Sequence, residues 1–300
     1  MFLVTTIIIF SSMVHATWNF ISKCEEVPSK EFFFIANTFG FLCLSPILIY
    51  WTVLKYFSCV IYVSILLSGL FEAMYFYYLA KAYKNGDISV VYPLARATIV
   101  LVVASFNIIF FSHLINNTYI IGCLVIILGC LMIPLTKPMS LPNSKSFKDQ
   151  SYLYAILVGM CSSAYHLIDT NNLSCLKTNS SNMDSVKISI MYTFLRGISI
   201  SSWLGVVIFF YDINRKKTKK VIKESFKNAL LTGLGIYFTY SLVLMAMYYS
   251  NNSSYIPALR QTGIIFSFLL GVCILKEPIY PLKIIGILLL FIGILLVLPY

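Results

Sequence analysis

The 300-residue chain carries 22 Lys and Arg against 11 Asp and Glu, giving a formal net charge of +11, and 59% of its residues are hydrophobic. Only 11% of its residues are charged and its mean hydropathy is +0.85, whereas a soluble globule carries charge on roughly a quarter of its residues. The composition therefore excludes a soluble globular protein and predicts that the chain lies in a lipid bilayer.

Ten apolar segments follow one another along the chain, most of them near the length of about 20 residues that crosses a hydrocarbon core of about 30 Å. They lack the strict alternation of barrel strands, and a lipid-exposed backbone must satisfy its own hydrogen bonds, so we expect helices. The predicted spans are 2–22, 32–54, 57–83, 88–111, 119–136, 151–171, 185–210, 228–249, 255–275 and 284–298. The first segment ends near a possible signal-peptide cleavage site, Val14-His-Ala16, but its apolar run is long and lacks a basic start, so we interpret it as a span.

The two halves of the chain repeat each other at an offset of 164 residues, so that Pro93 and Arg96 recur as Pro257 and Arg260. Such self-similarity indicates a duplicated fold. The same ungapped register pairs Gly122 with Gly286 and Gly129 with Gly293. The seven-residue spacing of each glycine pair places both glycines on one helix face, which predicts close helix packing.

Each copy contains five predicted helices, and an odd number requires the two copies to lie upside down relative to each other in the bilayer. This inverted arrangement is typical of secondary transporters, whose substrate site lies near the midplane between the repeats. We therefore predict an all-α polytopic membrane protein of ten transmembrane helices. Its two inverted five-helix repeats, 1–143 and 144–300, would form one integrated membrane domain.

The positive charge is unevenly distributed between the predicted loops, and the positive-inside rule then places the odd-numbered loops in the cytoplasm and both termini opposite. Sixteen basic residues lie in or beside odd-numbered loops: Lys23, Lys30, Lys81, Lys84, Lys137, Lys145, Lys148, Arg215, Lys216, Lys217, Lys219, Lys220, Lys223, Lys227, Lys276 and Lys283. Only Lys55, Lys177 and Lys187 flank even-numbered loops. The basic stretch 215–227 could also be a patch for anionic lipid or nucleic acid, but no nucleic-acid motif accompanies it, so no nucleic-acid partner is expected.

Two arginines lie inside predicted spans at equivalent positions of the repeats. Arg96 and Arg260 stand five to eight residues into their helices, roughly 8 to 12 Å at 1.5 Å per residue. Because an arginine in the membrane interior costs about 2.5 to 3.5 kcal/mol, each should face a cavity or a partner. We predict that both bind a substrate carboxylate or phosphate, the alternatives being snorkelling to headgroups or a structural ion pair.

Glu72, near the middle of the third span, is the most deeply placed acid of the chain. Burial disfavours an ionised carboxylate, so Glu72 is the predicted proton-coupling residue, with Asp169 as a second candidate near the end of the sixth span. The alternative is a permanent ion pair with Arg96 or Arg196. Arg196, in the middle of the seventh span, is expected either to contact substrate or to neutralise Glu72.

Polar and aromatic residues share a face of the first and of the sixth predicted helix, because their spacings match the helical repeat. Such faces suit a hydrated substrate path, although hydrogen bonding between helices would explain them equally well. They comprise His15, Trp18 and Asn19, and Tyr165, His166 and Asp169. Possible cavity linings among the many tyrosines are Tyr75, Tyr77, Tyr78 and Tyr92.

The motifs of several enzyme classes are missing from the chain. It has no G-x-x-x-x-G-K-[ST] loop, no H-E-x-x-H helix and no G-x-S-x-G elbow, and its eight cysteines form no C-x-x-C pair. The cysteines mostly lie in apolar spans and are expected to behave as small hydrophobes. We predict a protein that is not an enzyme, with no catalytic residues, metal site or cofactor.

Five segments of the chain resemble EamA-type transporters of the drug/metabolite transporter superfamily. These are His15-Ala-Thr-Trp-Asn-Phe-Ile-Ser-Lys23, Ala80-Lys-Ala-Tyr-Lys-Asn-Gly-Asp87, Val91-Tyr-Pro-Leu-Ala-Arg96, Tyr255-Ile-Pro-Ala-Leu-Arg-Gln-Thr262 and Leu275-Lys-Glu-Pro278. The resemblance implies ten helices in two repeats and movement of small metabolites, often export, driven by an ion gradient or by exchange. Two features depart from the family: Ser112-His-Leu-Ile-Asn116 stands where the second repeat has Lys276-Glu277, and the charge pattern opposes the termini-inside orientation of many relatives.

The expected function is therefore a secondary transporter, an exporter or permease, that moves a small polar and anionic metabolite by alternating access. Its expected partners are that small-molecule metabolite and membrane lipids, its expected state is a monomer or homodimer, and its expected location is the bacterial inner membrane. The alternatives are a lipid-carrier flippase and a membrane scaffold that transports nothing.

Overall fold

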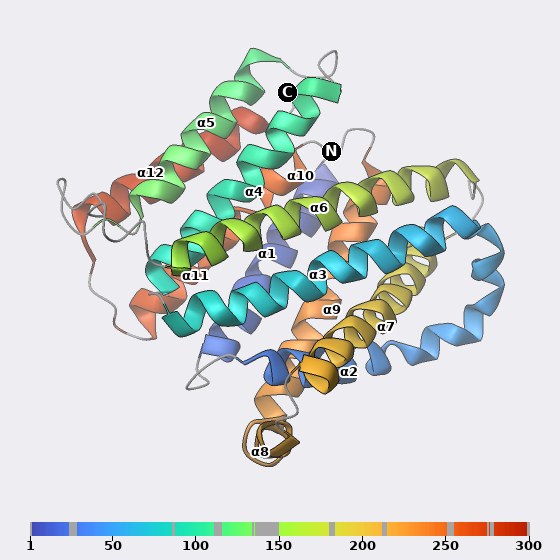
Figure 1. Ribbon diagram of the computed structural model, residues 1–300. Helices are drawn as coiled ribbons and strands as arrows, with labels where there is room; N and C mark the ends of the chain where they lie inside the picture. Colours follow the sequence, from blue (N-terminus) through green and yellow to red (C-terminus); the bar gives the residue numbers. More distant parts are fainter. Residues whose placement is uncertain are drawn as a thin grey trace.

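The computed structural model describes residues 2–23, 29–85, 88–110, 116–133, 135, 150–179, 184–211, 215–250, 255–274, 276 and 279–298. Its helices are α1 (Phe2–Lys23), α2 (Lys30–Cys43), η1 (Ser45–Tyr56), α3 (Cys59–Asn85), α4 (Ile88–Phe110), α5 (Asn117–Met132), α6 (Gln150–Asn179), α7 (Ser185–Tyr211), α8 (Arg215–Glu224), α9 (Phe226–Tyr249), α10 (Ile256–Leu259), α11 (Thr262–Cys273) and α12 (Pro281–Val297) (Figure 1). These ranges contain no strand, so the predicted all-α class is confirmed. The departures from family pattern at 112–115 and Glu277, and the basic residues Lys137, Lys145 and Lys148, lie outside them.

Seven stretches of the described chain are long and apolar enough to cross a membrane, or eight if the bent pair α2 and η1 forms one span. They are Phe2–Ser22, Cys59–Tyr83, Val91–Phe110, Gln150–Thr178, Ser185–Phe209, Phe226–Tyr249 and Ile256–Cys273. Two further apolar helices, α5 and α12, are shorter. The protein is thus a multi-pass integral membrane protein, whereas the count of ten spans stays a prediction.

The second predicted span is bent. Instead of one helix over 32–54, α2 ends at Cys43 and a helix of the 3-10 type, η1, continues at an angle of 69°. Pro46 explains the break, because the proline ring lacks an N–H donor and disfavours the α conformation of the preceding residue. The sequence prediction missed this bend because it followed hydrophobicity alone.

The sixth predicted span is longer than expected, since α6 runs to Asn179 rather than ending near 171. The hydroxyls of Thr170 and Ser174 donate to carbonyl oxygens one turn earlier, at 2.8 and 3.0 Å, so these polar groups are satisfied within the helix. Asp169 therefore lies well inside the helix and is fully buried, which corrects the prediction that it stands near a helix end.

The ninth predicted span is interrupted at its arginine. It consists of the single turn α10 and the longer α11, which meet at Arg260 and Gln261. Pro257 stands in the first turn, and its carbonyl accepts a hydrogen bond from Gln261 Nε2 at 2.9 Å. The interruption sets Arg260 at the C-terminal end of a one-turn helix rather than in the middle of a long one.

The basic stretch after the seventh span forms a helix of its own, α8, which the sequence analysis did not predict. Lys219, Lys220 and Lys223 are exposed on it, whereas Val221 packs against the apolar core beneath α2. The stretch is helical because it combines strong helix formers with one apolar contact face. Figure 1 shows α8 at one end of the bundle, away from the ends marked N and C.

Helix contacts come in pairs that correspond between the two halves of the chain. Helix α3 packs on α6 as α9 packs on α1, α4 on α6 as α11 on α1, and α3 on α7 as α9 on α2. Two further contacts, α2 with α7 and α5 with α12, each join one helix to its counterpart, whereas α4 packs on α5 more extensively than α11 packs on α12. Both chain ends lie at the same end of the bundle in Figure 1.

The pair α5 and α12 depends on glycine. A Cβ at Gly122 would lie 2.8 Å from the carbonyl oxygen of Gly293, and one at Gly129 would lie 2.6 Å from that of Gly286. Only hydrogen leaves room for this backbone approach, so the predicted close packing by these glycines is confirmed. The contacts run antiparallel, so each glycine of α5 meets the repeat equivalent of the other α5 glycine.

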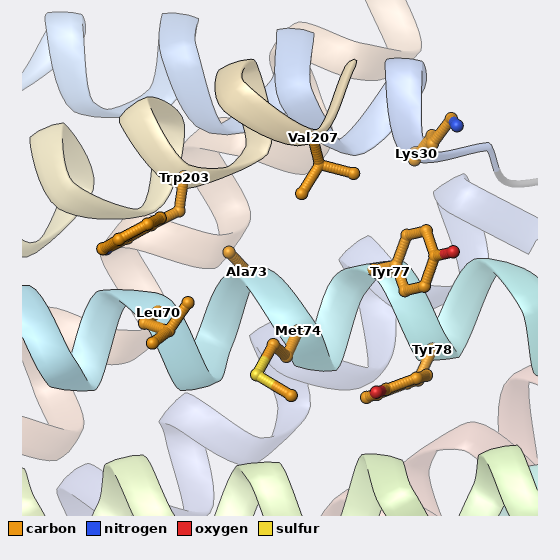
Figure 2. Close-up of a pocket in the computed structure, with 8 residues that line it drawn as sticks. All are labelled: Lys30, Leu70, Ala73, Met74, Tyr77, Tyr78, Trp203 and Val207. Carbon is orange, nitrogen blue, oxygen red and sulfur yellow. The ribbon is translucent and has the colours of Figure 1, made fainter. Parts of the chain in front are cut away.

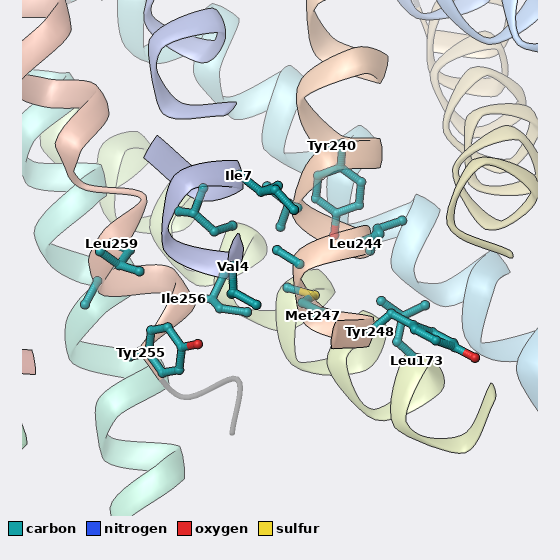
Figure 3. Close-up of a cluster of buried hydrophobic side chains, with 14 of the residues drawn as sticks. Val4, Ile7, Leu173, Tyr240, Leu244, Met247, Tyr248, Tyr255, Ile256 and Leu259 are labelled. Atoms are coloured by element: carbon teal, nitrogen blue, oxygen red, sulfur yellow. The ribbon is translucent and has the colours of Figure 1, made fainter. Parts of the chain in front are cut away.

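Three apolar clusters fill the described bundle interior. The largest, which we name the terminal cluster, includes Val4, Ile7, Leu244, Met247, Ile256 and Leu259, which pack between α1, α9 and α10 (Figure 3). The second, which we name the α2 cluster, joins α2 to α3, α7 and α9 and includes Phe32, Phe33, Phe76, Leu204 and Tyr237. The smallest, which we name the basic-side cluster, contains the buried residues Ala82, Val91 and Ala155 near the lysine-bearing end of α3.

Candidate functional site

Arg96 and Arg260 line one pocket in the bundle interior, which we name the arginine pocket. The other lining residues are His15, Tyr75, Leu79, Tyr92, Ala95, Ile99, Val158, Ser162 and Tyr165. Its volume is about 20 Å³, in a measure by which one water molecule needs roughly 10 to 15 Å³. The pocket is therefore closed around a water-sized space and must widen to admit a metabolite.

Arg96 is held by neutral groups within this pocket. Its side chain is only 7% exposed, its Nη2 donates to Tyr92 Oη at 3.0 Å and to His15 Nε2, and its guanidinium lies over the Tyr92 ring, 5.0 Å from the centroid. Tyr92 precedes Arg96 by one helical turn, which places both on one face of α4. Because a guanidinium can only donate, His15 accepts through Nε2 and is neutral in this arrangement.

Arg260 reaches the same pocket from the break between α10 and α11 and is partly buried. Among the described residues, neither Arg96 nor Arg260 has a carboxylate within ion-pair distance. The protein therefore brings two guanidinium groups to one cavity without balancing their charge there. Snorkelling does not describe Arg96, which is buried against His15 and Tyr92.

Besides Arg196, which lies with the acids described below, three residues predicted to contact substrate lie outside the described lining of the arginine pocket. Trp18 packs edge-on against His15, with 4.7 Å between ring centroids, and Asn19 Nδ2 donates to the His15 carbonyl at 2.9 Å. His166 is buried on α6. Of the face predicted on the first helix, only His15 reaches the pocket, and substrate contact by the other three stays a prediction.

A second polar group, which we name the ion cluster, joins the predicted acids to Arg196. Arg196 Nη1 lies 2.5 Å from Glu72 Oε2, and its Nε lies 3.1 Å from Asp169 Oδ2. The guanidinium also stacks over the Tyr240 ring, 3.9 Å from the centroid. The structure thus brings together Glu72, Asp169 and Arg196 from α3, α6 and α7, all deeply buried.

The two carboxylates of the ion cluster differ in how many donors they have. Asp169 accepts hydrogen bonds from Ser68 at 2.7 Å, from Tyr192 at 2.6 Å and from Tyr240. Glu72 has its ion pair with Arg196, but its Oε2 has no aligned hydrogen bond in the described structure. Asp169 therefore has more hydrogen-bond donors around its carboxylate than Glu72 has.

Tyr165 connects the arginine pocket to the ion cluster. It lines the pocket, and the Arg196 guanidinium lies 4.7 Å from its ring centroid. Its hydroxyl accepts from Ser162 at 3.0 Å, and its ring meets those of Tyr75 and Tyr240 edge-on. The ring of Tyr165 thus lies between the arginine pocket, which holds Arg96 and Arg260, and Arg196 of the ion cluster.

The sequence analysis missed several residues of these two groups. Ser68 and Tyr192 each precede a predicted charged residue, Glu72 and Arg196, by four positions, so the helical repeat could have found them. Tyr240 follows no such spacing from a charged residue on its own helix. Its role depends on how α9 packs in three dimensions.

Metal binding has no support in the described residues, which contain no group of three or more His, Cys, Asp or Glu able to hold an ion. The buried acids Glu72 and Asp169 both form ion pairs with Arg196.

Comparison with known proteins supports the sequence resemblance. Residues 178–298, which span α7 to α12 and so most of the second repeat, match the model of the EamA-like transporter family. The predicted resemblance to EamA-type transporters is confirmed. This family is part of the drug/metabolite transporter superfamily, and its members are generally non-enzymatic membrane transporters or permeases.

A solved structure described as the crystal structure of a protein shares the fold. The similarity covers 98% of this chain and 94% of that chain, with a TM-score of 0.69 and 14% sequence identity. At this identity the likeness concerns the fold alone, which it extends over both halves of the chain. No curated protein shows a significant match.

Proposed function

We propose that the protein is a secondary transporter that moves a small, polar, anionic metabolite across the membrane by alternating access. The observation that carries this proposal is the pair Arg96 and Arg260, which line one pocket without a carboxylate partner in the described structure. Two unbalanced cations in the membrane interior are costly and call for a ligand that supplies the missing charge. A carboxylate or phosphate would satisfy both through charge-assisted hydrogen bonds.

The proposed architecture is ten spans in two inverted repeats of five. Seven spans, the bent pair and the two shorter apolar helices fit this number. The paired helix contacts and the glycine pair of α5 and α12 fit an approximate twofold relation between the repeats. Under this relation Arg96 and Arg260 approach one midplane site from opposite sides.

The proposed transport cycle opens the arginine pocket to one side at a time. Toward one end it is closed by the terminal cluster, in which Leu259 directly precedes Arg260. Toward the lysine-bearing end it is closed by the basic-side cluster, about one turn beyond the pocket lining, and by the α2 cluster, to which the lining residues Leu79, Ala95 and Val158 belong. Opening at either end therefore requires packed apolar side chains to separate.

Proton coupling is assigned to the ion cluster, with Glu72 as the residue that exchanges the proton and Asp169 as its charged neighbour. Protonation of Glu72 would leave Arg196 paired with Asp169 alone, so the guanidinium would be held less strongly toward α3. Tyr165, which touches Arg196 and lines the pocket, offers a physical route from this change to the substrate site. The coupling ion and the bound substrate would then be linked through one side chain.

The proposed setting is a bacterial inner membrane, with the odd-numbered loops in the cytoplasm and export or exchange as the direction. The supporting observation is the basic α8 together with the lysines near the ends of α1 and α3. A reporter fused to the C-terminus should therefore be found outside the cytoplasm. A cytoplasmic reporter would reverse the orientation.

The experiment that tests the proposed function measures thermal stabilisation of the detergent-purified protein by a panel of metabolites. A ligand that binds only the folded state raises the melting temperature by mass action. We expect organic acids or phosphates to stabilise the native protein, and Arg96→Ala and Arg260→Ala to lose that stabilisation and the corresponding transport in proteoliposomes. Lys177→Ala, at the surface end of α6, is the matched control. Stabilisation by amines alone, or normal transport by both arginine variants, would reject the proposal.

A further inference from the structure

A larger cavity lies between α3 and α7, next to the start of α2 (Figure 2). Its volume is about 400 Å³. It is lined by Lys30, Leu70, Ala73, Met74, Tyr77, Tyr78, Trp203 and Val207, and we name it the lateral groove. It shares no lining residue with the arginine pocket.

The groove begins where the close contact between α3 and α7 ends. At Gly69 a Cβ would lie 2.5 Å from Ser199 Cβ, so the two helices touch there. Trp203 Nε1 donates to the Leu66 carbonyl at 3.2 Å, which holds the indole across the narrow end. From Leu70 onward the helices leave a space between them, which Figure 2 shows bounded by side chains from both.

Helix α3 presents different chemistry on its two faces. Glu72 and Tyr75 point into the bundle, to the ion cluster and the arginine pocket. Leu70, Met74 and Tyr77, spaced three or four residues apart, line the lateral groove instead. The groove is therefore separate from the proposed substrate site, although both depend on one helix.

The groove has an apolar body and a cationic end. From Leu70 to Tyr78 it extends eight residues along α3, about 12 Å at 1.5 Å per residue. Figure 2 shows Lys30 and Tyr77 together at one end and Trp203 and Leu70 at the other. Lys81 stands over the Tyr77 ring, 4.3 Å from its centroid, so two lysines flank the same end. An amphiphile with an apolar tail and an anionic head fits this pattern.

A single extended hydrocarbon chain is much narrower than a helix, whose diameter with side chains is about 10 to 12 Å, and it fits along the groove beside α3. Both walls belong to predicted membrane spans, and Trp203 is 37% exposed at the groove, so lipid tails can reach it laterally.

We propose that the lateral groove binds one anionic phospholipid of the surrounding bilayer, with an acyl chain along Leu70 to Tyr78 and the phosphate at Lys30 and Lys81. The aromatic rings of Tyr77 and Tyr78 lie at the depth where the chain meets the headgroup, as is usual for tyrosine in membrane proteins. Lysine attracts anionic lipid at such a position. This site stands independently of the proposed transport activity, because it uses other residues.

The acyl-chain part is tested by filling the groove. Val207→Phe places a ring in it, whereas Val206→Phe places the same ring on the neighbouring, 42% exposed position that does not line the groove. Purified proteins are titrated with dioleoyl phosphatidylglycerol in mixed micelles, and bound lipid is counted by native mass spectrometry. We expect one retained lipid and a raised melting temperature for the native chain and Val206→Phe, with at least a tenfold loss of affinity for Val207→Phe. Unchanged lipid binding by Val207→Phe would overturn the proposal. Met74→Phe provides a second filling variant if Val207→Phe does not fold.

The headgroup part is tested by replacing phosphatidylglycerol with phosphatidylcholine. We expect the native chain to prefer the anionic lipid about tenfold, and the double variant Lys30→Gln, Lys81→Gln to lose the preference. Lys55→Gln, on η1 and remote from the groove lining, should keep it. Equal binding of both lipids by the native chain would reject an anionic site. If instead the protein moves labelled lipid between leaflets and Val207→Phe stops it, the groove admits cargo and a resident lipid is ruled out.

Discussion

Arg96 and Arg196 are both buried arginines on long apolar helices, 7% and 2% exposed, yet their surroundings are opposite. Arg196 lies against two carboxylates and over two tyrosine rings. Arg96 contacts one neutral histidine and one tyrosine and, among the described residues, has no carboxylate partner. The same residue type therefore serves charge balance within the protein at one position and leaves charge available to a ligand at the other.

The difference follows from what each environment does to an isolated charge. A buried arginine beside two carboxylates has its charge balanced, whereas a guanidinium without a carboxylate partner in the membrane interior remains costly until an anion binds. Buried charges without a partner are found mainly at functional sites. The presence of carboxylate partners at Arg196 and their absence around Arg96 among the described residues is the reason for assigning proton coupling to the ion cluster and substrate binding to the arginine pocket.

The largest effect should come from removing the cation of the ion cluster. Arg196→Met leaves Glu72 and Asp169 buried without their partner, and breaking a buried pair in this way costs about 3 to 5 kcal/mol. We expect the melting temperature, measured by fluorescence-detected gel filtration, to fall by roughly 10 °C. The triple variant that also carries Glu72→Gln and Asp169→Asn should recover most of this loss. A native melting temperature for Arg196→Met alone would contradict the charge-balance view.

The next effect separates the two acids. Asp169→Asn replaces a carboxylate that accepts three hydroxyl hydrogen bonds, so we expect it to lower the free energy of unfolding by about 2 kcal/mol. Glu72→Gln replaces a carboxylate with fewer hydrogen bonds and should lower it by less. In proteoliposomes, Glu72→Gln should lose the response to an imposed proton gradient while substrate exchange at equilibrium continues. If proton-driven uptake survives in Glu72→Gln, the coupling role moves away from Glu72.

Arg96→Met should change stability little or raise it slightly, in contrast to Arg196→Met, because it removes an unpaired charge. The same variant should lose at least tenfold in affinity for an anionic ligand, equivalent to about 1.4 kcal/mol. Melting curves with and without the best anion from the panel measure both quantities at once. A large destabilisation without ligand would show that Arg96 has a structural partner after all.

The smallest effect is expected at Tyr165, between the two regions. Tyr165→Phe keeps the ring beneath Arg196 and loses only the hydroxyl contact with Ser162, so its stability should fall by about 1 kcal/mol or less. Tyr165→Leu removes the ring and should weaken the dependence of anion affinity on pH while leaving binding itself detectable. An identical pH dependence in Tyr165→Leu and the native chain would exclude this side chain as the link.

Much of this arrangement was predictable because charge inside a membrane is rare and therefore conspicuous. Arg96, Arg196, Arg260 and Glu72 stood out in otherwise apolar segments, and the 164-residue repeat indicated that two of the arginines are equivalent. The sequence analysis named Arg96 and Arg196 as possible partners of Glu72, but the choice of Arg196 and the addition of Asp169 were not predictable, since nothing local to Arg196 selects them. That selection results from the packing of α3, α6 and α7.

The errors in the fold have local physical causes. The bend after Cys43 follows from Pro46, and the break at Arg260 follows Pro257, both of which hydrophobicity alone conceals. Helix α6 continues through a polar stretch whose hydroxyls bond to carbonyls of the same helix, so the span does not end where the hydrophobicity falls. The lateral groove could not be predicted at all, because Val207 and Trp203 meet α3 only in three dimensions.

The glycine contact of α5 with α12 also constrains the order of assembly during synthesis. Helix α5 leaves the ribosome long before α12, and at about 5 to 20 residues per second the delay is on the order of ten seconds. During that time the backbone groove at Gly122 and Gly129 faces lipid or the insertion machinery rather than its own partner. Helix α5 of the first repeat therefore gains its packing partner only when α12, the last helix, has been synthesised.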